Sequence, residues 1–293
     1  MTRRPYTASH RSMERVLSVL YTGGWAARLW ALVPGATRVR LIEHSLSIPG
    51  RENGRPPLRI AFASDLHLGP TTPREVLDAA FARIEATRPD VLALGGDYVF
   101  LGATKDRVRE LQTRVMRVTA PVKLAVLGNH DFWARPERLE DCLTQAGVRV
   151  LVNDSVRLPP PHDDVAVIGL DDPLTSRRIT DKIALQEGVD AALARVADVP
   201  IKIAVCHSPD GYPEVKGRGV QLLLCGHTHG GHIALPGYRP LWIPGPHGRL
   251  WPHGRHDVDG LTVFVSRGVG GSLVPMRTYA PPDVALITID RAP

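Results

Sequence analysis

Acidic, amide and histidine side chains follow five short apolar runs in this chain of 293 residues. The apolar runs are 58–63, 91–94, 123–127, 201–206 and 221–225. The polar residues that follow them are Asp65 and His67, then Asp97, then Asn129, His130 and Asp131, then His207, and finally His227 and His229. Each motif alone is a weak signal. Five of them in order, each after a run of strand length, predict one shared site.

The side-chain types predict what this site binds. Two carboxylates, one amide and four imidazoles, with no cysteine among them, suit Mn²⁺, Fe²⁺ or Zn²⁺ better than Ca²⁺ or Mg²⁺. Seven ligands exceed one tetrahedral site and are enough for two ions that share a carboxylate. Two ions about 3.5–4 Å apart stabilise the attacking and leaving oxygens of a displacement at phosphorus. The candidate metal ligands are Asp65, His67, Asp97, Asn129, His207, His227 and His229.

The elements that must position these residues follow from the same pattern. Short apolar runs predict buried strands, and residues 74–87 and 106–118 between the first three have helical character. The steps from Asp65 to Asp97 and from Asp97 to Asn129 are both 32 residues, the size of a βαβ unit. Because such units are parallel, we expect the carboxyl ends of the strands to share one edge of a sheet. Glycines that would let the strands turn sharply before a ligand are Gly96, Gly128 and Gly226.

This set of motifs resembles the complete motif set of the calcineurin-like metallophosphoesterases, over about residues 58–290. The chain most resembles the bacterial YkuE/YaeI-like phosphodiesterase branch. The segments behind that resemblance are 64–67, 96–99, 169–172, 226–231, 267–270 and 275–277. The resemblance implies an α/β fold, a four-layer α/β/β/α sandwich of two mixed β-sheets flanked by helices.

The resemblance also implies a role for each residue. The ligands would divide into Asp65, His67, Asp97 and His229 for one ion and Asp97, Asn129, His207 and His227 for the other, so that Asp97 bridges. A metal-bridging hydroxide would attack the phosphorus of a phosphodiester or pyrophosphate. His130 would protonate the leaving alkoxide, and Asp131 would orient His130.

Charge divides the chain into two parts. The formal net charge is +6, and residues 1–56 hold nine arginines against three acidic residues, whereas residues 57–293 hold 27 of each sign. We therefore predict a basic amphipathic N-terminal extension, 1–56, and a phosphoesterase domain, 57–293. A domain without net charge, in a chain with only 5% aromatic residues, argues against a nuclease.

The extension contains apolar residues at helical spacing, among them Met13, Val16, Leu17 and Leu20. Its longest uncharged run, residues 16–27, has 12 residues, fewer than the roughly 20 of a membrane-spanning helix. Basic residues opposite tryptophan and leucine over residues 11–33 are typical of a helix that lies on an anionic membrane surface. The alternative is a helix packed on the domain itself. Two consecutive glycines, Gly23 and Gly24, weaken the helix in either case.

Location is predicted from the cysteines and the N-terminus. Three cysteines without a CxxC pair, Cys142, Cys206 and Cys225, favour a reducing compartment. Cys206 and Cys225 lie inside apolar runs and are expected in the core. The pair Arg3-Arg4 invites a twin-arginine export signal, but Arg11 and Glu14 separate it from the apolar stretch. We expect a cytoplasmic protein, with peripheral attachment to a membrane and export left open.

Several alternatives remain at the level of the sequence. Lipid-linked substrates such as UDP-2,3-diacylglucosamine or phospholipids would fit the basic extension. A non-catalytic, metal-bound scaffold is disfavoured because no ligand position is missing. Four further histidines could bind substrate or be incidental. His232 follows the last motif, and His247, His253 and His256 lie in the loop 236–260. The pair Asp171-Asp172 is expected to form a turn or to support the ligands from behind, and not to form a third metal site.

Overall fold

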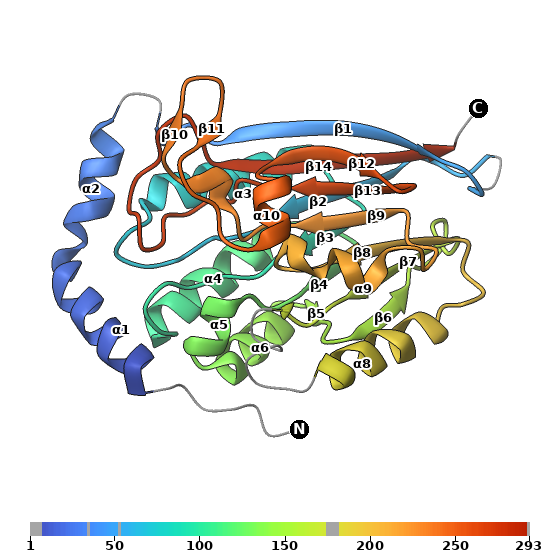
Figure 1. The fold of residues 1–293 in the computed structure, drawn as a ribbon, viewed down its shortest axis with the longest axis horizontal. Coiled ribbons are helices and arrows are strands. Elements are labelled where there is room, and N and C mark those ends of the chain that lie inside the picture. Colours follow the sequence, from blue (N-terminus) through green and yellow to red (C-terminus); the bar gives the residue numbers. More distant parts are fainter. Residues whose placement is uncertain (1–7, 34–35, 52–53, 174–181, 292–293) are drawn as a thin grey trace.

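The computed structural model describes residues 8–33, 36–51, 54–173 and 182–291, so that the predicted export signal at Arg3-Arg4 lies outside the described residues. Two six-stranded mixed sheets, with helices around them, form the molecule (Figure 1). Their strand orders are β1-β14-β2-β3-β4-β5 and β12-β13-β9-β8-β7-β6. The predicted α/β sandwich is therefore confirmed.

The first sheet contains the three strands that precede the first three motifs. Its parallel members are β2 (Leu58–Ala63), β3 (Val91–Leu94), β4 (Val122–Ala125) and the short β5 (Arg149–Val150). The sheet is mixed because β14 (Asp283–Arg291) runs antiparallel to β2 and parallel to β1 (Arg40–Ile48). Strand β1 lies within the range predicted as the extension. The division of the chain at residue 56 stays a prediction. Residues 1–56 contribute β1 as an edge strand to a sheet whose other strands belong to residues 57–293.

The second sheet contains the strands that precede His207 and His227. Its parallel members are β7 (Val165–Gly169), β8 (Ile201–Val205), β9 (Leu222–Cys225) and β13 (Leu261–Val265). Antiparallel edges are formed by β6 (Asp154–Arg157) and β12 (Gly254–Val258). The five motif strands thus belong to two sheets rather than to one, and their carboxyl ends meet because β2 and β9 point the same way (Figure 1).

Helices begin and end where the sequence provides signals. Helix α3 (Arg74–Thr87) follows Pro73, and α4 (Lys105–Arg117) is capped by Thr104, which accepts a bond from the Arg107 N–H. Both agree with the predicted ranges to within a residue. The other helices are α5 (Asn129–Trp133), α6 (Pro136–Gln145), α8 (Lys182–Ala194), α9 (Tyr212–Val215) and α10 (Pro246–Leu250). Short 3₁₀ turns and a small hairpin complete the fold, η2 (Pro209–Gly211), η3 (His229–Gly231), β10 (Ala234–Leu235) and β11 (Arg239–Pro240).

Alternation along the strands produces three apolar layers. Leu58, Ile60 and Phe62 of β2 face the second sheet, while Ala61 and Ala63 face the layer of α3, α4 and α6. Small alanines on that side let the helices pack close to the sheet. A third layer covers the far face of the second sheet with α8 and α9, and it contains the buried Cys206 and Cys225 that the sequence assigns to the core.

The N-terminal residues form two helices, as the two glycines suggest. Helix α1 (Ala8–Leu20) and α2 (Trp25–Leu32) are separated by η1 (Thr22–Gly24), where Gly23 and Gly24 take positive φ angles of 74° and 65°. Trp30 of α2 is fully buried in the first core layer. Within the described ranges, no helix has the length and apolarity that a bilayer crossing requires.

Candidate metal centre

Turns that follow the motif strands hold their side chains with an unusual backbone. Asp65, His67, Asp97, His227 and His229 all have positive φ, between 44° and 69°. Non-glycine residues avoid this region, at a cost of about 1–3 kcal/mol each. Five of the seven predicted ligands share this conformation, which indicates that the surrounding fold holds these turns in place.

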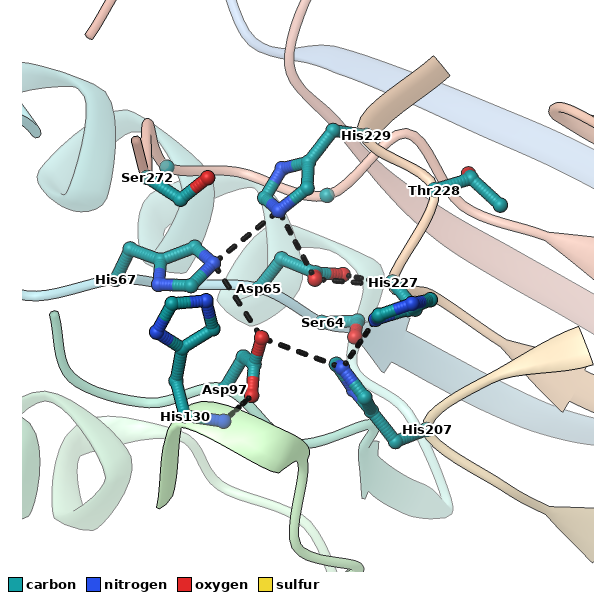
Figure 2. Close-up of polar contacts among 12 residues, drawn as sticks. Ser64, Asp65, His67, Asp97, His130, His207, His227, Thr228, His229 and Ser272 are labelled. Carbon is teal, nitrogen blue, oxygen red and sulfur yellow. Dashed lines mark hydrogen bonds and ion pairs between the residues drawn. The ribbon is translucent and has the colours of Figure 1, made fainter. Parts of the chain in front are cut away.

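Asp97 lies at the middle of the cluster (Figure 2). Its Oδ2 is 3.5 Å from Nε2 of His67 and 3.3 Å from Nε2 of His207. Its Oδ1 accepts a hydrogen bond of 2.8 Å from the backbone N–H of His130. One carboxylate oxygen therefore lies between imidazoles that come from different sheets.

The remaining motif side chains extend the cluster on both sides of Asp97. Nε2 of His229 is 3.4 Å from Oδ1 of Asp65 and 3.2 Å from Nε2 of His67, and Nδ1 of His227 is 3.2 Å from Nε2 of His207. Two groups result, each with its ligand atoms within 4.8 Å: Asp65, His67 and His229 in one, and Asp97, His207 and His227 in the other. A third group links them and consists of His67, Asp97 and His130.

A buried oxygen without a partner points to a bound cation. Oδ1 of Asn129 is buried without a hydrogen-bond partner among the residues that the structure describes. Buried polar atoms rarely lack partners in folded proteins, and a metal ion is one way to satisfy them. This amide oxygen, together with the carboxylates and imidazoles of the cluster, belongs to the donor types that Mn²⁺, Fe²⁺ and Zn²⁺ accept, so the residues present fit divalent cations.

Burial prepares several imidazoles for coordination. It lowers the pKa of His227 to about 3 and lowers the pKa values of His67 and His229 well below 6.5. Neutral imidazole is the form that binds metals. For Asp97, burial favours the protonated form, but His207, His130 and His67 together hold its pKa below the ordinary value. Asp97 therefore stays charged at the centre of the cluster.

Two glycines are required because the chains approach closely. A Cβ at Gly226 would lie 2.0 Å from Oγ of Ser64 and 2.3 Å from Oδ2 of Asp65. A Cβ at Gly128 would lie 2.2 Å from Oδ1 of Asp97. The glycines before the ligands thus leave room for the carboxylates.

Neighbouring groups orient the candidate ligands. His207 donates from Nδ1 to the carbonyl of Gly95 at 2.8 Å, which directs Nε2 toward Asp97. The carboxylate of Asp131 accepts backbone N–H bonds from Asp97, Tyr98 and Gly128 at 2.7–2.9 Å. Asp131 therefore ties the Asp97 turn to the start of α5, which carries His130. These bonds go to backbone N–H groups, and the expected role of Asp131 in orienting His130 stays a prediction.

Arg277 and Thr72 also support the site, and their roles were not found from the sequence. The buried guanidinium of Arg277 lies 3.1 Å from Nδ1 of His229 and donates to four carbonyl oxygens, those of His229, Arg267, Gly270 and Ala280. Thr72 donates to the carbonyl of His67 at 2.8 Å. Arg277 belongs to a segment that carried the family resemblance, whereas nothing in the local sequence distinguishes Thr72.

The remaining histidines lie outside the three ligand groups. His232 is buried, stacks on His229 with ring centroids 4.0 Å apart, and lies 3.1 Å from Oγ of Ser272. His247 contacts Asp210, His253 lies 3.3 Å from Arg267, and His256 contacts the carbonyl of His253.

Asp171 and Asp172 follow β7 in irregular backbone, without the turn that the sequence leads us to expect. The side chain of Asp171 accepts a bond from the backbone N–H of Asp172 at 3.0 Å. Neither residue belongs to a ligand group among the described residues.

Comparison with known proteins identifies the family. Residues 58–231 match the family model of the calcineurin-like phosphoesterases. The chain belongs to this family. It is 26% identical over 254 residues to the uncharacterised metallophosphoesterase YkuE of Bacillus subtilis, covering 86% of this chain and 85% of that protein. It is 25% identical over 252 residues to the phosphodiesterase YaeI of Escherichia coli, covering 85% and 87%.

A solved structure agrees on the fold. TT1561 of Thermus thermophilus matches with a TM-score of 0.51 at 14% identity, covering 73% of this chain and 91% of that one. Family membership and the Asp/His groups establish the chain as a metal-dependent phosphoester hydrolase, as the sequence predicts.

Proposed function

We propose that this enzyme hydrolyses phosphodiester or pyrophosphate bonds at a centre of two divalent cations. The observation that carries the proposal is the position of Asp97, whose Oδ2 is shared by His67 and His207 at 3.5 and 3.3 Å. A single carboxylate between two ligand groups is suited to bridge two cations. The similarity to YaeI, which is named a phosphodiesterase, supports the choice of bond.

The ligand groups indicate how the cations would be held. One would use Asp65, His67, Asp97 and His229, and the other Asp97, Asn129, His207 and His227. When bound, Mn²⁺, Fe²⁺ or Zn²⁺ would supply an acidified water and positive charge beside the phosphate oxygens.

His130 is the proposed proton donor. Its backbone N–H is bonded to Asp97, and its ring lies 4.9 Å from the ring of His67, so it borders the centre without belonging to the predicted ligands. It would give a ring proton to the leaving oxygen. Asp131 would keep the His130 turn and the Asp97 turn in register through its three backbone bonds.

Asp97→Asn tests the proposal. We expect this variant to lose more than about hundredfold in kcat/KM with Mn²⁺ and bis-p-nitrophenyl phosphate, because the amide removes the bridging charge. Asp106→Asn, at an exposed position of α4, is the matched control and keeps full activity. Metal content by mass spectrometry should fall in Asp97→Asn alone. Equal activity and equal metal content in both variants would refute the proposal.

A membrane-associated hydrolase of lipid-linked substrates is the second candidate. Val16, Val19 and Leu20 of α1 are 51–76% exposed, and Leu29 and Leu32 of α2 are 49% and 76% exposed. Large apolar side chains on consecutive helices, in the part of the chain that holds the net positive charge, suit an anionic lipid surface. A cytoplasmic enzyme attached peripherally to the membrane would satisfy this pattern.

Sedimentation with anionic vesicles distinguishes this candidate. The double variant Val16→Ser and Val19→Ser should bind vesicles of phosphatidylglycerol at least tenfold more weakly than the wild type. Met116→Ser, which removes a 59% exposed side chain from α4, is the control. Unchanged binding in the double variant argues against attachment through α1.

A further inference from the structure

His130 also borders an apolar environment. A narrow cleft is lined by His130 and by Phe100, Leu101 and Trp133. The His130 ring packs against Trp133 and Phe100 with centroid distances of 4.6 and 5.6 Å. The proposed proton donor thus contacts both the candidate ligands and an apolar wall.

Helix α1 supplies the opposite wall. Met13 and Leu17 line the cleft, and Leu273 completes its rim. Tyr21, at the end of α1, holds this arrangement together, since its hydroxyl donates to the carbonyl of Leu273 at 2.8 Å and its ring packs with Phe100. The N-terminal segment is therefore part of the surroundings of the site.

The composition of the cleft limits what can enter it. Apart from His130, every lining side chain is an aliphatic, thioether or aromatic group. A sugar or nucleotide leaving group would lose hydrogen bonds with water there and gain few in return. The cavity volume is about 20 Å³, which leaves room for a methyl-sized group and not for a ring system. Two of its lining residues, Met13 and Leu273, are 40% and 48% exposed, so the cleft reaches the protein surface and only the first carbons of a chain are enclosed.

From these contacts we propose that the cleft is a leaving-group subsite for a slim aliphatic alcohol. The proposal rests on the proposed function, because a group that receives its proton from His130 must lie beside His130. The substrate is then a phosphodiester with an aliphatic chain on the leaving oxygen. Water adds to phosphorus and gives up a proton, the P–O bond to the chain breaks, the alcohol departs with a proton from His130, and the proton released by the water restores His130.

Hydrolysis of methyl alkyl phosphates with chains of two, six and ten carbons tests the subsite, at concentrations below micelle formation. We expect kcat/KM to rise about two- to fourfold per methylene over the first carbons, as expected for apolar burial, and then to level off. Leu17→Ser should flatten this dependence. Met13→Ser should do the same without a folding defect, because Met13 is part-exposed. Val16→Ser, on the same helix outside the cleft, is the control.

The outcomes separate this inference from the proposed function. If the enzyme hydrolyses bis-p-nitrophenyl phosphate but its kcat/KM for the methyl alkyl phosphates does not depend on chain length, the subsite alone is overturned. No hydrolysis of any diester overturns the proposed function. In that case, binding of n-alkylphosphonates measured by calorimetry still tests the subsite. The dissociation constant should fall with chain length for the wild type and should not do so for Met13→Ser. An unchanged slope in both cleft variants rejects the subsite.

Discussion

At the scale of single residues, chemistry is divided between His130 and the candidate metal ligands. The backbone N–H of His130 bonds to Asp97 and its ring contacts His67, and the same ring packs on Phe100 and Trp133. A proton donor beside the cluster can act on the leaving oxygen, whereas Asp97 and its neighbours are suited to hold cations. The two functions should therefore respond differently to the leaving group.

His130→Asn tests that division. For diesters with aliphatic leaving groups, kcat should fall about 10²- to 10⁴-fold, because an alkoxide needs a proton to depart. For p-nitrophenyl diesters the loss should be much smaller, since nitrophenolate leaves without one. Metal content should stay at the wild-type level. Equal losses for both leaving groups would show that His130 does not supply the proton.

Gly226→Ala tests the close approach of β9 to the Asp65 turn. The new methyl would meet Ser64 and Asp65 at 2.0 and 2.3 Å, so we expect about 1–3 kcal/mol of destabilisation and a loss of metal affinity. Gly217→Ala, where no atom lies within 4 Å, should cost about 1 kcal/mol through its positive φ and leave metal affinity intact. Thermal unfolding and metal titration measure both, and intact affinity in Gly226→Ala would contradict the prediction.

At the scale of elements, α2 connects the N-terminal segment to the core. Trp30 is fully buried beside Val39, and its indole N–H donates to the carbonyl of Ala36 at 3.1 Å. The next element, β1, pairs in parallel with β14 along its whole length. Trp30 and β1, which follow α1 in the chain, therefore fix the position of α1 beside the His130 cleft.

Trp30→Ala should lower the free energy of unfolding by about 3–5 kcal/mol, because the loss of a buried indole leaves a cavity. Trp242→Ala, which removes a 69% exposed side chain, is the matched control and should change stability by less than about 0.5 kcal/mol. Chemical denaturation measures both values. Similar stabilities of the two variants would show that α2 contributes little to the fold.

At the scale of the whole molecule, the site joins the two sheets. Asp65 and Asp97 follow strands of the first sheet, and His207 and His227 follow strands of the second. Cations bound there would link the sheets and offset the repulsion between buried carboxylates. Because the cations bind the folded chain and not the unfolded chain, their binding must stabilise the fold.

Metal removal should therefore lower the melting temperature. At a concentration of Mn²⁺ or Zn²⁺ 100 times the dissociation constant, each site adds about 2.7 kcal/mol to the free energy of unfolding. Addition of a chelator to wild type should reverse the gain, and Asp97→Asn should show little of it. Identical melting temperatures of the wild type with chelator and with excess metal would contradict this expectation.

Much of the site could be predicted from the sequence, because strand-length apolar runs and the ligands that follow them are local patterns. The βαβ spacing placed the carboxyl ends together, and the types of Asp65, Asn129 and the histidines indicated the class of metal. Gly128 and Gly226 could be selected because each precedes a ligand. These inferences need only short-range periodicity and side-chain chemistry.

Only the tertiary structure decided the features that depend on contacts distant in sequence. It distributed the five strands over two sheets, paired β1 with β14, and brought Arg277 to His229 across 48 positions. It also placed α1 beside His130, which no spacing indicates. Such contacts are set by the packing of whole layers, because burial of apolar faces is non-directional and does not specify which distant segment provides the covering surface.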